Sequence, residues 1–340
     1  MAMSSNKPSS GLFHGAFPFP IGEDPAVGES VPPVFVRTHP LDPDDAAVTA
    51  TMRTMVAPFK GVQRGTEARG QFDALMEGVL PRDEMTFEAD VVGGMPGIWA
   101  YPAKWRPDEA ILHLHGGWFN LGSATAYRHL VAHIAARAGA RAFIPDYRLA
   151  PEHPFPAATD DVLACYRGLA GNGASRIALT GDSAGGNLAL VLASRLVGKA
   201  APADARPVAV VVLSPITDLT LSGATYDTRA EADPFFTRPQ AAELVRSYLR
   251  EADPKQVLAS PLNGQMAGMP PVRIHVGDDE VLLDDSRRYA ERAFAAGVDI
   301  RLDVWMGMAH GFPASIGKLN AATQALDAIG AFLTGRLRAN

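Results

Sequence analysis

The sequence predicts an α/β protein whose central sheet is mostly parallel, has about eight strands and is flanked by helices. From about residue 85 onward, short apolar segments alternate with longer segments of helical periodicity. The run VAVVVL at 208–213 is wholly apolar, as expected of a parallel strand that is buried on both faces. A chain of 340 residues can bury such a core as one large domain.

The expected strands follow in order along the chain. Residues 84–92 and 98–103 flank GGMPG and indicate an antiparallel hairpin. Further strands are expected at 111–115, 141–147, 176–183, 208–213, 272–276 and 300–305. Helices are expected at 123–139, after PFPAA, at 184–197, at 285–297 and at the carboxyl end. No internal repeat interrupts this order.

Two segments depart from the alternation. Residues 1–84 combine a loop rich in Pro, Gly and Phe with two expected helices at 44–56 and 66–80. Residues 216–262 separate two strands and contain the amphipathic stretch RPQAAELVRSYLR. Because ligands bind beyond the carboxyl ends of parallel strands, we expect both segments to form one composite helical lid. The catalytic core would then comprise 85–215 and 263–340.

Composition and charge limit the possible partners. A net charge of −6 argues against nucleic acid, and the longest apolar run is too short to span a membrane. The single cysteine, Cys165, excludes an internal disulfide framework and is interpreted as a buried core thiol. The first residues lack the basic and apolar regions of a secretory signal, so we expect a cytoplasmic protein that binds a small molecule.

The stretch RIALTGDSAGGN contains the strongest catalytic signal. It places G-D-S-A-G between an expected strand and an expected helix, which is the context of a nucleophile elbow. Gly181 and Gly185 allow the tight turn, and Ser183 lies at the amino end of the helix, next to Asp182. The Ala184 amide is therefore a candidate donor to an oxyanion.

Upstream, ILHLHGGWFNLGS ends a strand in His115-Gly116-Gly117. A glycine-rich loop can aim backbone N–H groups at a developing oxyanion. His113 and His115 form an H-x-H pair, but no further Cys, His or carboxylate at ligand spacing accompanies them, so we expect no metal.

Near the carboxyl end, IRLDVWMGMAHGF puts His310 on a loop after the last strand, where a general base is expected. In this arrangement the acid lies between the serine and the histidine in chain order. The cluster GDDEVLLDDS at 277–286 follows an expected strand in that interval and precedes a helix. It is therefore the candidate source of the acid.

Taken together, HGG, PDYRLAPEHPFPAATDD, GDSAGGN and AHGF, over roughly residues 85–315, resemble the bacterial hormone-sensitive lipase family (family IV) of α/β-hydrolase esterases. The resemblance implies a Ser-His-acid triad, a lid from the N-terminus and an insertion, no cofactor, and hydrolysis of esters with short acyl chains. It also implies an oxyanion hole formed by Gly117, Trp118 and Ala184. A homodimer is expected from family likeness alone.

Trp118 departs from the family pattern, which has a third glycine at this position. The backbone N–H is retained, but a positive φ angle would strain a tryptophan. We expect the indole to narrow the acyl or alcohol pocket.

The resemblance also selects among the clustered acids. Aligned without gaps from Ala296-Gly297-Val298 and His310-Gly311-Phe312, the family motif puts the triad acid at Glu280. Asp279 is the second choice, because aspartate is the commoner residue in this role and a loop shift of one residue would bring it forward. Asp284 and Asp285 are expected to cap the following helix, and Asp278 to order the turn.

The expected function is that of a serine carboxylesterase. The same residues could cleave amides, lactones or formamides, and the sequence does not choose among these leaving groups. A small-molecule receptor without catalysis is a further alternative from a different class.

Overall fold

The structure is a computed structural model that describes residue 1 and residues 34–62, 65–197 and 206–339. Its helices and strands all lie in the unit Pro33–Asn340. In this described part of the chain, nine strands form one sheet. They are β1 (Val36–His39), β2 (Met85–Val92), β3 (Met95–Pro102), β4 (Glu109–Leu114), β5 (Arg141–Pro145), β6 (Arg176–Asp182), β7 (Ala209–Leu213), β8 (Val272–Gly277) and β9 (Ile300–Trp305).

The sheet has the strand order β1-β9-β8-β7-β6-β4-β5-β3-β2. Strand β3 pairs antiparallel with both β2 and β5, and all other neighbours are parallel. The eight expected strands are therefore present, and the prediction of a mostly parallel sheet is confirmed. Because β6, β7, β8 and β9 are parallel neighbours, their carboxyl ends lie next to one another.

Strand β1 is the ninth strand, and no sequence pattern predicts it. It pairs in parallel with β9 at the edge of the sheet, with Val36 opposite Leu302. Its sequence, VRTH, is short and has three polar residues of four, so it carries no periodic signal. Residues 36–39 fall in the segment 1–84 that the sequence assigns to the lid, and they instead extend the core sheet. The rest of the division into core and lid stays a prediction, and residues 2–33 lie outside the described residues.

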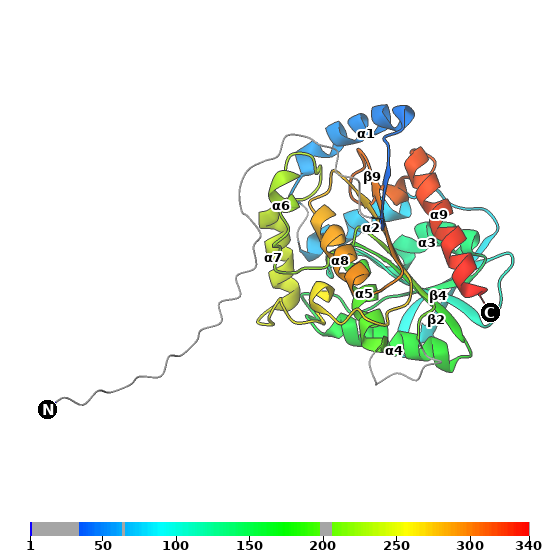
Figure 1. The fold of residues 1–340 in the computed structure, drawn as a ribbon. Helices are drawn as coiled ribbons and strands as arrows, with labels where there is room; N and C mark the ends of the chain where they lie inside the picture. Colours follow the sequence, from blue (N-terminus) through cyan, green and yellow to red (C-terminus); the bar gives the residue numbers. More distant parts are fainter. Residues whose placement is uncertain (2–33, 63–64, 198–205, 340) are drawn as a thin grey trace. The chain divides into compact units, whose positions relative to one another are not determined.

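Helices cover both faces of the sheet (Figure 1). Helices α3 and α9 pack on one face, and α4, α5 and α8 pack on the other. The longer helices are α1 (Pro43–Val56), α2 (Arg69–Glu77), α3 (Ala124–Ala138), α4 (Ala157–Gly171), α5 (Ser183–Val197), α7 (Arg238–Leu249), α8 (Leu283–Ala295) and α9 (Asn320–Leu337). Short helical turns occur at η1 (Ala57–Phe59), η2 (Thr66–Ala68), α6 (Thr225–Thr228), η4 (Pro261–Asn263) and η5 (Phe312–Ser315).

The core is divided by the sheet into two main clusters. Leu112 and Leu114 of β4 face the cluster that contains α5, whereas Ile111 faces the cluster that contains α3. All three side chains are fully buried. Burying each such side chain contributes about 1.5–3 kcal/mol, so the apolar strands drive the formation of both layers.

Local capping explains where several helices begin and end. The Ser123 hydroxyl accepts a hydrogen bond from the Ala126 amide at the start of α3, and Gly139 ends this helix with a φ of 62°. Thr237 caps α7 in the same way through the Gln240 amide. These signals account for the close agreement between the expected and observed helices.

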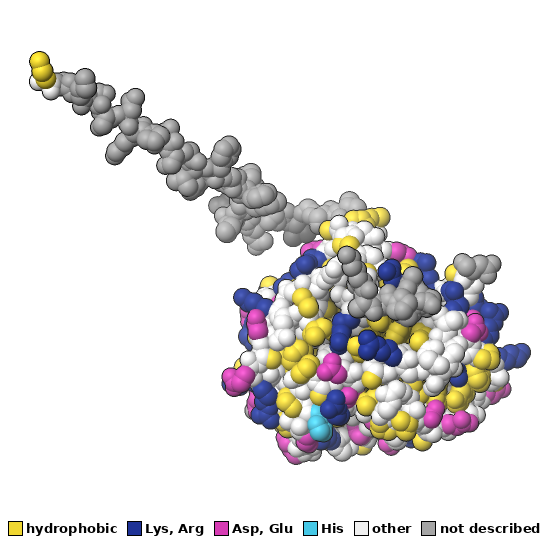
Figure 2. Space-filling model, turned by 90° about the horizontal axis from the view of Figure 1, so that it is seen from below, with side chains coloured by type: hydrophobic (Ala, Val, Ile, Leu, Met, Phe, Trp, Pro, Cys, Tyr) yellow, Lys and Arg dark blue, Asp and Glu magenta, His cyan; other side chains and the backbone are white. Residues whose placement is uncertain are grey.

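Charged side chains of both signs are scattered among hydrophobic ones on the face drawn in Figure 2. This mixed distribution matches the modest net charge of −6. No helix among the described residues is both long and apolar enough to cross a membrane.

Candidate active site

Ser183 is the first residue of α5 and directly follows β6. Its φ angle is 53°, a conformation that costs a non-glycine residue free energy. The turn is possible because Gly185 lies so close to the carbonyl of Leu114 that a side chain would overlap it. A Cβ atom at Gly181 would likewise meet the Gly185 carbonyl. The elbow therefore holds Ser183 at the carboxyl end of a central strand, with 4% of its surface exposed.

Asp182 joins this elbow to the loop after β4. Its Oδ1 accepts a hydrogen bond from the Gly116 amide at 2.9 Å, and its Oδ2 accepts one from the Tyr127 hydroxyl at 2.9 Å. Gly117 follows in the loop with a φ of 110°, where a Cβ atom would meet the Leu121 carbonyl. The loop that carries Gly117 is thus tied to the strand end that carries Ser183.

The two histidines of this region also stabilise the loop. His115 Nδ1 lies 2.8 Å from the Gly116 carbonyl oxygen, and the Tyr147 ring stacks on His115 at 4.2 Å. Burial lowers the pKa of His115, so the ring is neutral near pH 7 and its Nδ1 donates to the carbonyl. His113 Nδ1 lies 2.9 Å from Thr180 Oγ1 inside the sheet. Within the described ranges, no group of three or more His, Cys, Asp or Glu residues could hold a metal ion.

Trp118 adopts the strained conformation that its side chain disfavours, with a φ of 54°. Its indole is buried and forms a T-shaped contact with Phe236, at 5.3 Å between ring centroids. Ala184 lies in the first turn of α5, where backbone N–H groups have no partner within the helix. The three residues expected at the oxyanion hole thus lie on the loop and the helix turn that Asp182 connects.

Glu280 contacts the candidate general base directly. Its Oε2 lies 2.8 Å from His310 Nδ1, and its side chain is fully buried. The other carboxylate oxygen accepts hydrogen bonds from Ser214 Oγ and the Gly277 amide, both at 2.6 Å. Burial alone lowers the pKa of His310, but the charge and hydrogen bond of Glu280 outweigh it, with further contributions from Asp233 and Asp182, so the pKa is raised.

Asp279, the second choice for the acid, forms a different contact. It pairs with Arg53 of α1, which also donates to the Ala232 carbonyl. Burial raises the pKa of Asp279, and the Arg53 charge opposes this effect. The structure therefore brings Glu280, rather than Asp279, to the imidazole of His310.

A chain of contacts connects Ser183 with this pair. The Ile216 amide donates to the Ser183 carbonyl at 3.3 Å, and Ser214, two residues earlier, donates to Glu280. Both residues follow β7, which lies between β6 and β8. The serine, the acid and the histidine therefore all lie beyond the carboxyl ends of neighbouring parallel strands.

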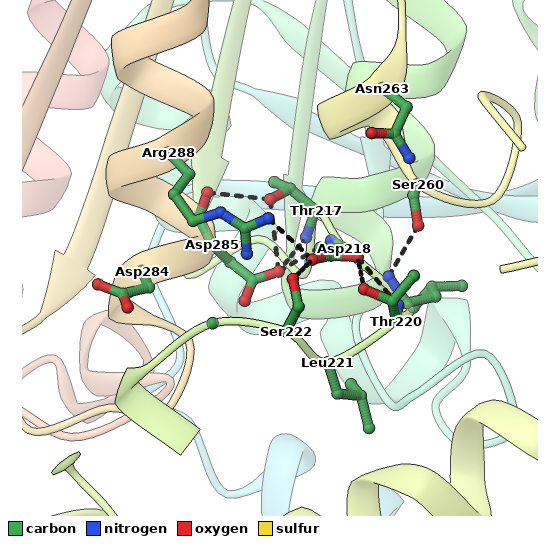
Figure 3. A network of polar contacts seen from close by, with 12 residues as sticks. Thr217, Asp218, Thr220, Leu221, Ser222, Ser260, Asn263, Asp284, Asp285 and Arg288 are labelled. Carbon is green, nitrogen blue, oxygen red and sulfur yellow. Dashed lines mark hydrogen bonds and ion pairs between the residues drawn. The ribbon is translucent and has the colours of Figure 1, made fainter. Parts of the chain in front are cut away.

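Neither Asp284 nor Asp285 caps α8 through its side chain, so the expectation for these two acids is wrong. Helix α8 begins without a side-chain cap, and the Asp285 carboxylate instead accepts from the amides of Thr217 and Asp218, at 2.7 and 2.9 Å (Figure 3). Burial raises the pKa of Asp285 to about 7. Arg288 pairs with Asp218 at 3.0 Å beside a surface hollow of about 420 Å³, whose lining includes none of the triad candidates. Asp278 accepts from the Gly307 amide and orders the turn, as expected.

The sequence assigns no role in the site to Ser214 or Asp233, and it offers Phe236 only as one of several aromatic candidates to line the pocket. Ser214 follows the carboxyl end of β7, and its polar side chain at a strand end is a signal that could have identified it. Asp233 and Phe236 lie in the insertion, where no periodic pattern marks them. They reach the site only through contacts with distant segments, Asp233 with Val281 and Phe236 with His310.

Comparison with known proteins defines the class. Residues 111–314 match a family model described as the alpha/beta hydrolase fold. The chain is 36% identical over 258 residues to an acetyl-hydrolase of Streptomyces hygroscopicus, covering 75% of this chain and 83% of that protein. A crystal structure of an esterase from the bacterial hormone-sensitive lipase family superposes with a TM-score of 0.81 at 36% identity, covering 87% and 99% of the two chains. The structure of the esterase EstE5 soaked with p-nitrophenyl butyrate has a TM-score of 0.80 at 32% identity, covering 88% and 100%.

The nine-stranded sheet with its serine elbow is that of an α/β hydrolase. Within this fold, the chain belongs to the bacterial hormone-sensitive lipase family of esterases and is a carboxylic ester hydrolase.

Proposed function

We propose that this esterase hydrolyses esters of short acyl chains through an acyl-enzyme, with Ser183 as nucleophile, His310 as general base and Glu280 as the acid. The contact between the buried Glu280 carboxylate and His310 Nδ1, at 2.8 Å, is the observation that carries the proposal. A carboxylate in this position fixes the tautomer that leaves Nε2 free to accept a proton, and it stabilises the imidazolium that forms. Two further hydrogen bonds, from Ser214 Oγ and the Gly277 amide, hold the Glu280 carboxylate in its orientation.

The reaction proceeds in two halves. Ser183 Oγ attacks the ester carbonyl carbon as His310 takes its proton, and the amides of Gly117, Trp118 and Ala184 stabilise the oxyanion. The imidazolium then protonates the leaving alcohol. Water, activated by the same imidazole, attacks the acyl-enzyme, and the carboxylic acid leaves as Ser183 recovers its proton.

The proposal of short acyl chains rests on two kinds of support. Relatives include a protein named acetyl-hydrolase and an esterase that was soaked with a butyrate ester. In this chain the buried Trp118 indole stands where the family pattern has glycine, and it contacts Phe236 next to His310. We expect this aromatic pair to limit the length of the acyl group.

Hydrolysis of p-nitrophenyl esters of increasing acyl length tests the proposal. We expect kcat/KM to be highest for acetyl to butyryl esters and to vanish in Ser183→Ala. Glu280→Gln should lower kcat by about 10³-fold or more, because the amide cannot stabilise the imidazolium, whereas Asp279→Asn should change kcat by less than about tenfold. A large fall in Asp279→Asn alone would contradict the assignment of the acid. Turnover of amides or lactones in place of esters would contradict the proposed substrate class.

A further inference from the structure

Asp233 is a fully buried carboxylate in the insertion between β7 and β8. Its Oδ1 accepts hydrogen bonds from the amides of Phe235 and Phe236, at 2.8 and 3.0 Å. Its Oδ2 accepts one from the Val281 amide at 2.9 Å. Val281 directly follows Glu280 in the loop between β8 and α8, residues 278–282, which we call the acid loop. The single carboxylate of Asp233 therefore binds the insertion to the acid loop.

The hydrogen bonds of Asp233 also position an aromatic ring. Phe236, whose amide is fixed by Asp233, makes a T-shaped contact with the imidazole of His310, at 4.9 Å between centroids. The same ring contacts Trp118 at 5.3 Å. Asp233 thus binds two segments that contact the imidazole, namely the loop that carries Glu280 and the segment that carries the Phe236 ring.

A second, uncharged contact holds the same loop. The Thr225 hydroxyl donates to the Val281 carbonyl at 2.7 Å, and the Asp284 amide donates to Thr225 Oγ1 at 3.1 Å. Thr225 and Asp233 therefore bind the two backbone groups of Val281. Because only Asp233 is ionisable, the two residues allow mechanical and electrostatic effects to be separated.

The charged groups around this region are well defined. Burial raises the pKa of Asp233, its three amide hydrogen bonds lower it, and the charge of Glu280 raises it further. The negative charges of three carboxylates raise the pKa of His310: Glu280, Asp233 and Asp182. The pKa of the neighbouring Asp279 is raised by the charges of Asp278 and Asp233 and lowered by those of Arg53 and Arg229.

Building on the proposed triad, we infer that Asp233 is a positioning residue that couples the insertion to the acid loop, holds the Phe236 ring on His310 and directs a negative charge toward the imidazole. Catalysis therefore depends on the contact between the insertion and the acid loop, because the Asp233 carboxylate that makes this contact also aligns Glu280 and His310.

The test compares kcat, KM and the acid limb of kcat/KM for p-nitrophenyl acetate over the pH range in which histidine titrates. Asp233→Asn keeps the side-chain shape but turns one acceptor oxygen into an amide that cannot accept from Val281. We expect kcat to fall by about tenfold or more with KM changed by less than about threefold. The acid limb should move to lower pH, since the loss of a nearby negative charge lowers the pKa of His310.

Two matched variants separate charge from loop order. Thr225→Val loosens the same loop without a change of charge, so kcat should fall while the acid limb stays in place. Asp227→Asn makes the same chemical change on an exposed carboxylate of the insertion, which pairs with Arg238, and should leave both values unaltered. An Asp233→Asn variant with wild-type kcat, or with an acid limb as unmoved as that of Thr225→Val, overturns the inference.

If Asp233→Asn does not fold, Phe236→Leu tests the arm that reaches His310. Its kcat should fall without movement of the acid limb, and a wild-type kcat overturns the inference. Ser183→Ala distinguishes the two proposals. Wild-type turnover in that variant overturns the proposed function and this inference together, whereas an inactive Ser183→Ala beside a wild-type-like Asp233→Asn overturns the inference alone.

Discussion

Four residues around the candidate site have positive φ angles although none is glycine. They are Trp118 at 54°, Phe119 at 64°, Ser183 at 53° and Ser214 at 46°. Each such conformation costs about 1–2 kcal/mol and persists only where the surrounding packing determines it. Here the packing is dense, because all four side chains are buried. The strain is therefore concentrated in the loops that carry the proposed nucleophile, the oxyanion donors and the hydroxyl that orients Glu280.

Trp118 provides the sharpest prediction at this scale. Trp118→Gly removes the indole that contacts Phe236, and it relieves the backbone strain that the positive φ angle causes. We expect kcat/KM for the hexanoyl ester to rise relative to the acetyl ester by about tenfold, since pocket space for a methylene is worth about 1–3 kcal/mol. The free energy of unfolding should fall by about 2–4 kcal/mol, because loss of a buried tryptophan leaves a cavity. Trp118→Phe should give intermediate selectivity, and an unchanged ratio in Trp118→Gly would refute the narrowed pocket.

At the scale of elements, three segments that lie far apart in sequence converge on the acid loop. Helix α1 reaches it through Arg53 and Asp279, α6 through Thr225, and the following turn through Asp233. Lys60 and Gly61, just beyond η1, also bind the insertion through the carbonyls of Ala230 and Phe235. The N-terminal helix and the insertion therefore both contact the acid loop, and their assignment to one composite lid stays a prediction.

Removal of the α1 contact should have a modest and salt-dependent effect. The side chains of Arg53 and Asp279 are 30% and 20% exposed, so their pair contributes about 1 kcal/mol. Arg53→Met should lower the Tm by about 2 °C at low ionic strength, and added salt should reduce the difference from wild type. Arg37→Met is the matched control, because Arg37 on β1 is exposed and has no ion pair within the described ranges. Equal Tm values for both variants would show that the α1 contact does not stabilise the protein.

At the scale of the whole molecule, a buried cluster at the β1 edge of the sheet links stability to pH. His39 of β1 stacks on Trp305 at 3.7 Å and bonds Asp303 Oδ1 at 2.8 Å. His275 lies opposite Asp303 in the sheet and accepts from Trp305 Nε1 at 3.2 Å. Burial lowers the pKa of His275 to about 4. Burial alone raises the pKa of Asp303, but hydrogen bonds from His39 and Arg301 and nearby positive charge hold it at about 2.

Both groups make the fold less stable in acid. The unfolded chain binds a proton at His275 near pH 6.5, whereas the folded protein does so only near pH 4, so stability falls as the pH drops below 6.5. The depressed pKa of Asp303 adds a loss between about pH 4 and pH 2. The raised pKa of Asp285 acts in the opposite direction between about pH 4 and pH 7, so the total curve alone does not isolate His275.

A difference measurement removes the contribution of Asp285. His275→Gln keeps an acceptor for Trp305 and cannot titrate. The stability advantage of wild type over this variant should shrink by up to about 3 kcal/mol as the pH falls from about 6.5 to 4. Denaturant unfolding of both proteins at several pH values measures it, and a constant difference would contradict the buried neutral histidine.

Much of the fold follows from local sequence patterns. Eight strands and the main helices agree with their expected positions because apolar periodicity, capping residues and glycine turns act within a few residues of one another. The elbow at Ser183 and the loop histidine His310 were also predictable, since each motif lies at the end of an expected strand. The choice of Glu280 over Asp279 required the register of a family motif, and its role in the reaction remains a prediction.

The amino-acid sequence by itself determined the parallel sheet, the serine elbow and the chain order of the candidate triad. Tertiary structure decided the rest: the edge strand β1, the left-handed backbone at Trp118, the pairing of Asp279 with Arg53 and the binding of Val281 by Asp233. Those contacts join residues separated by 226 and 48 positions in the last two cases. No local pattern encodes such pairs, because a buried carboxylate becomes favourable only when distant segments supply the N–H groups and cations that replace its water.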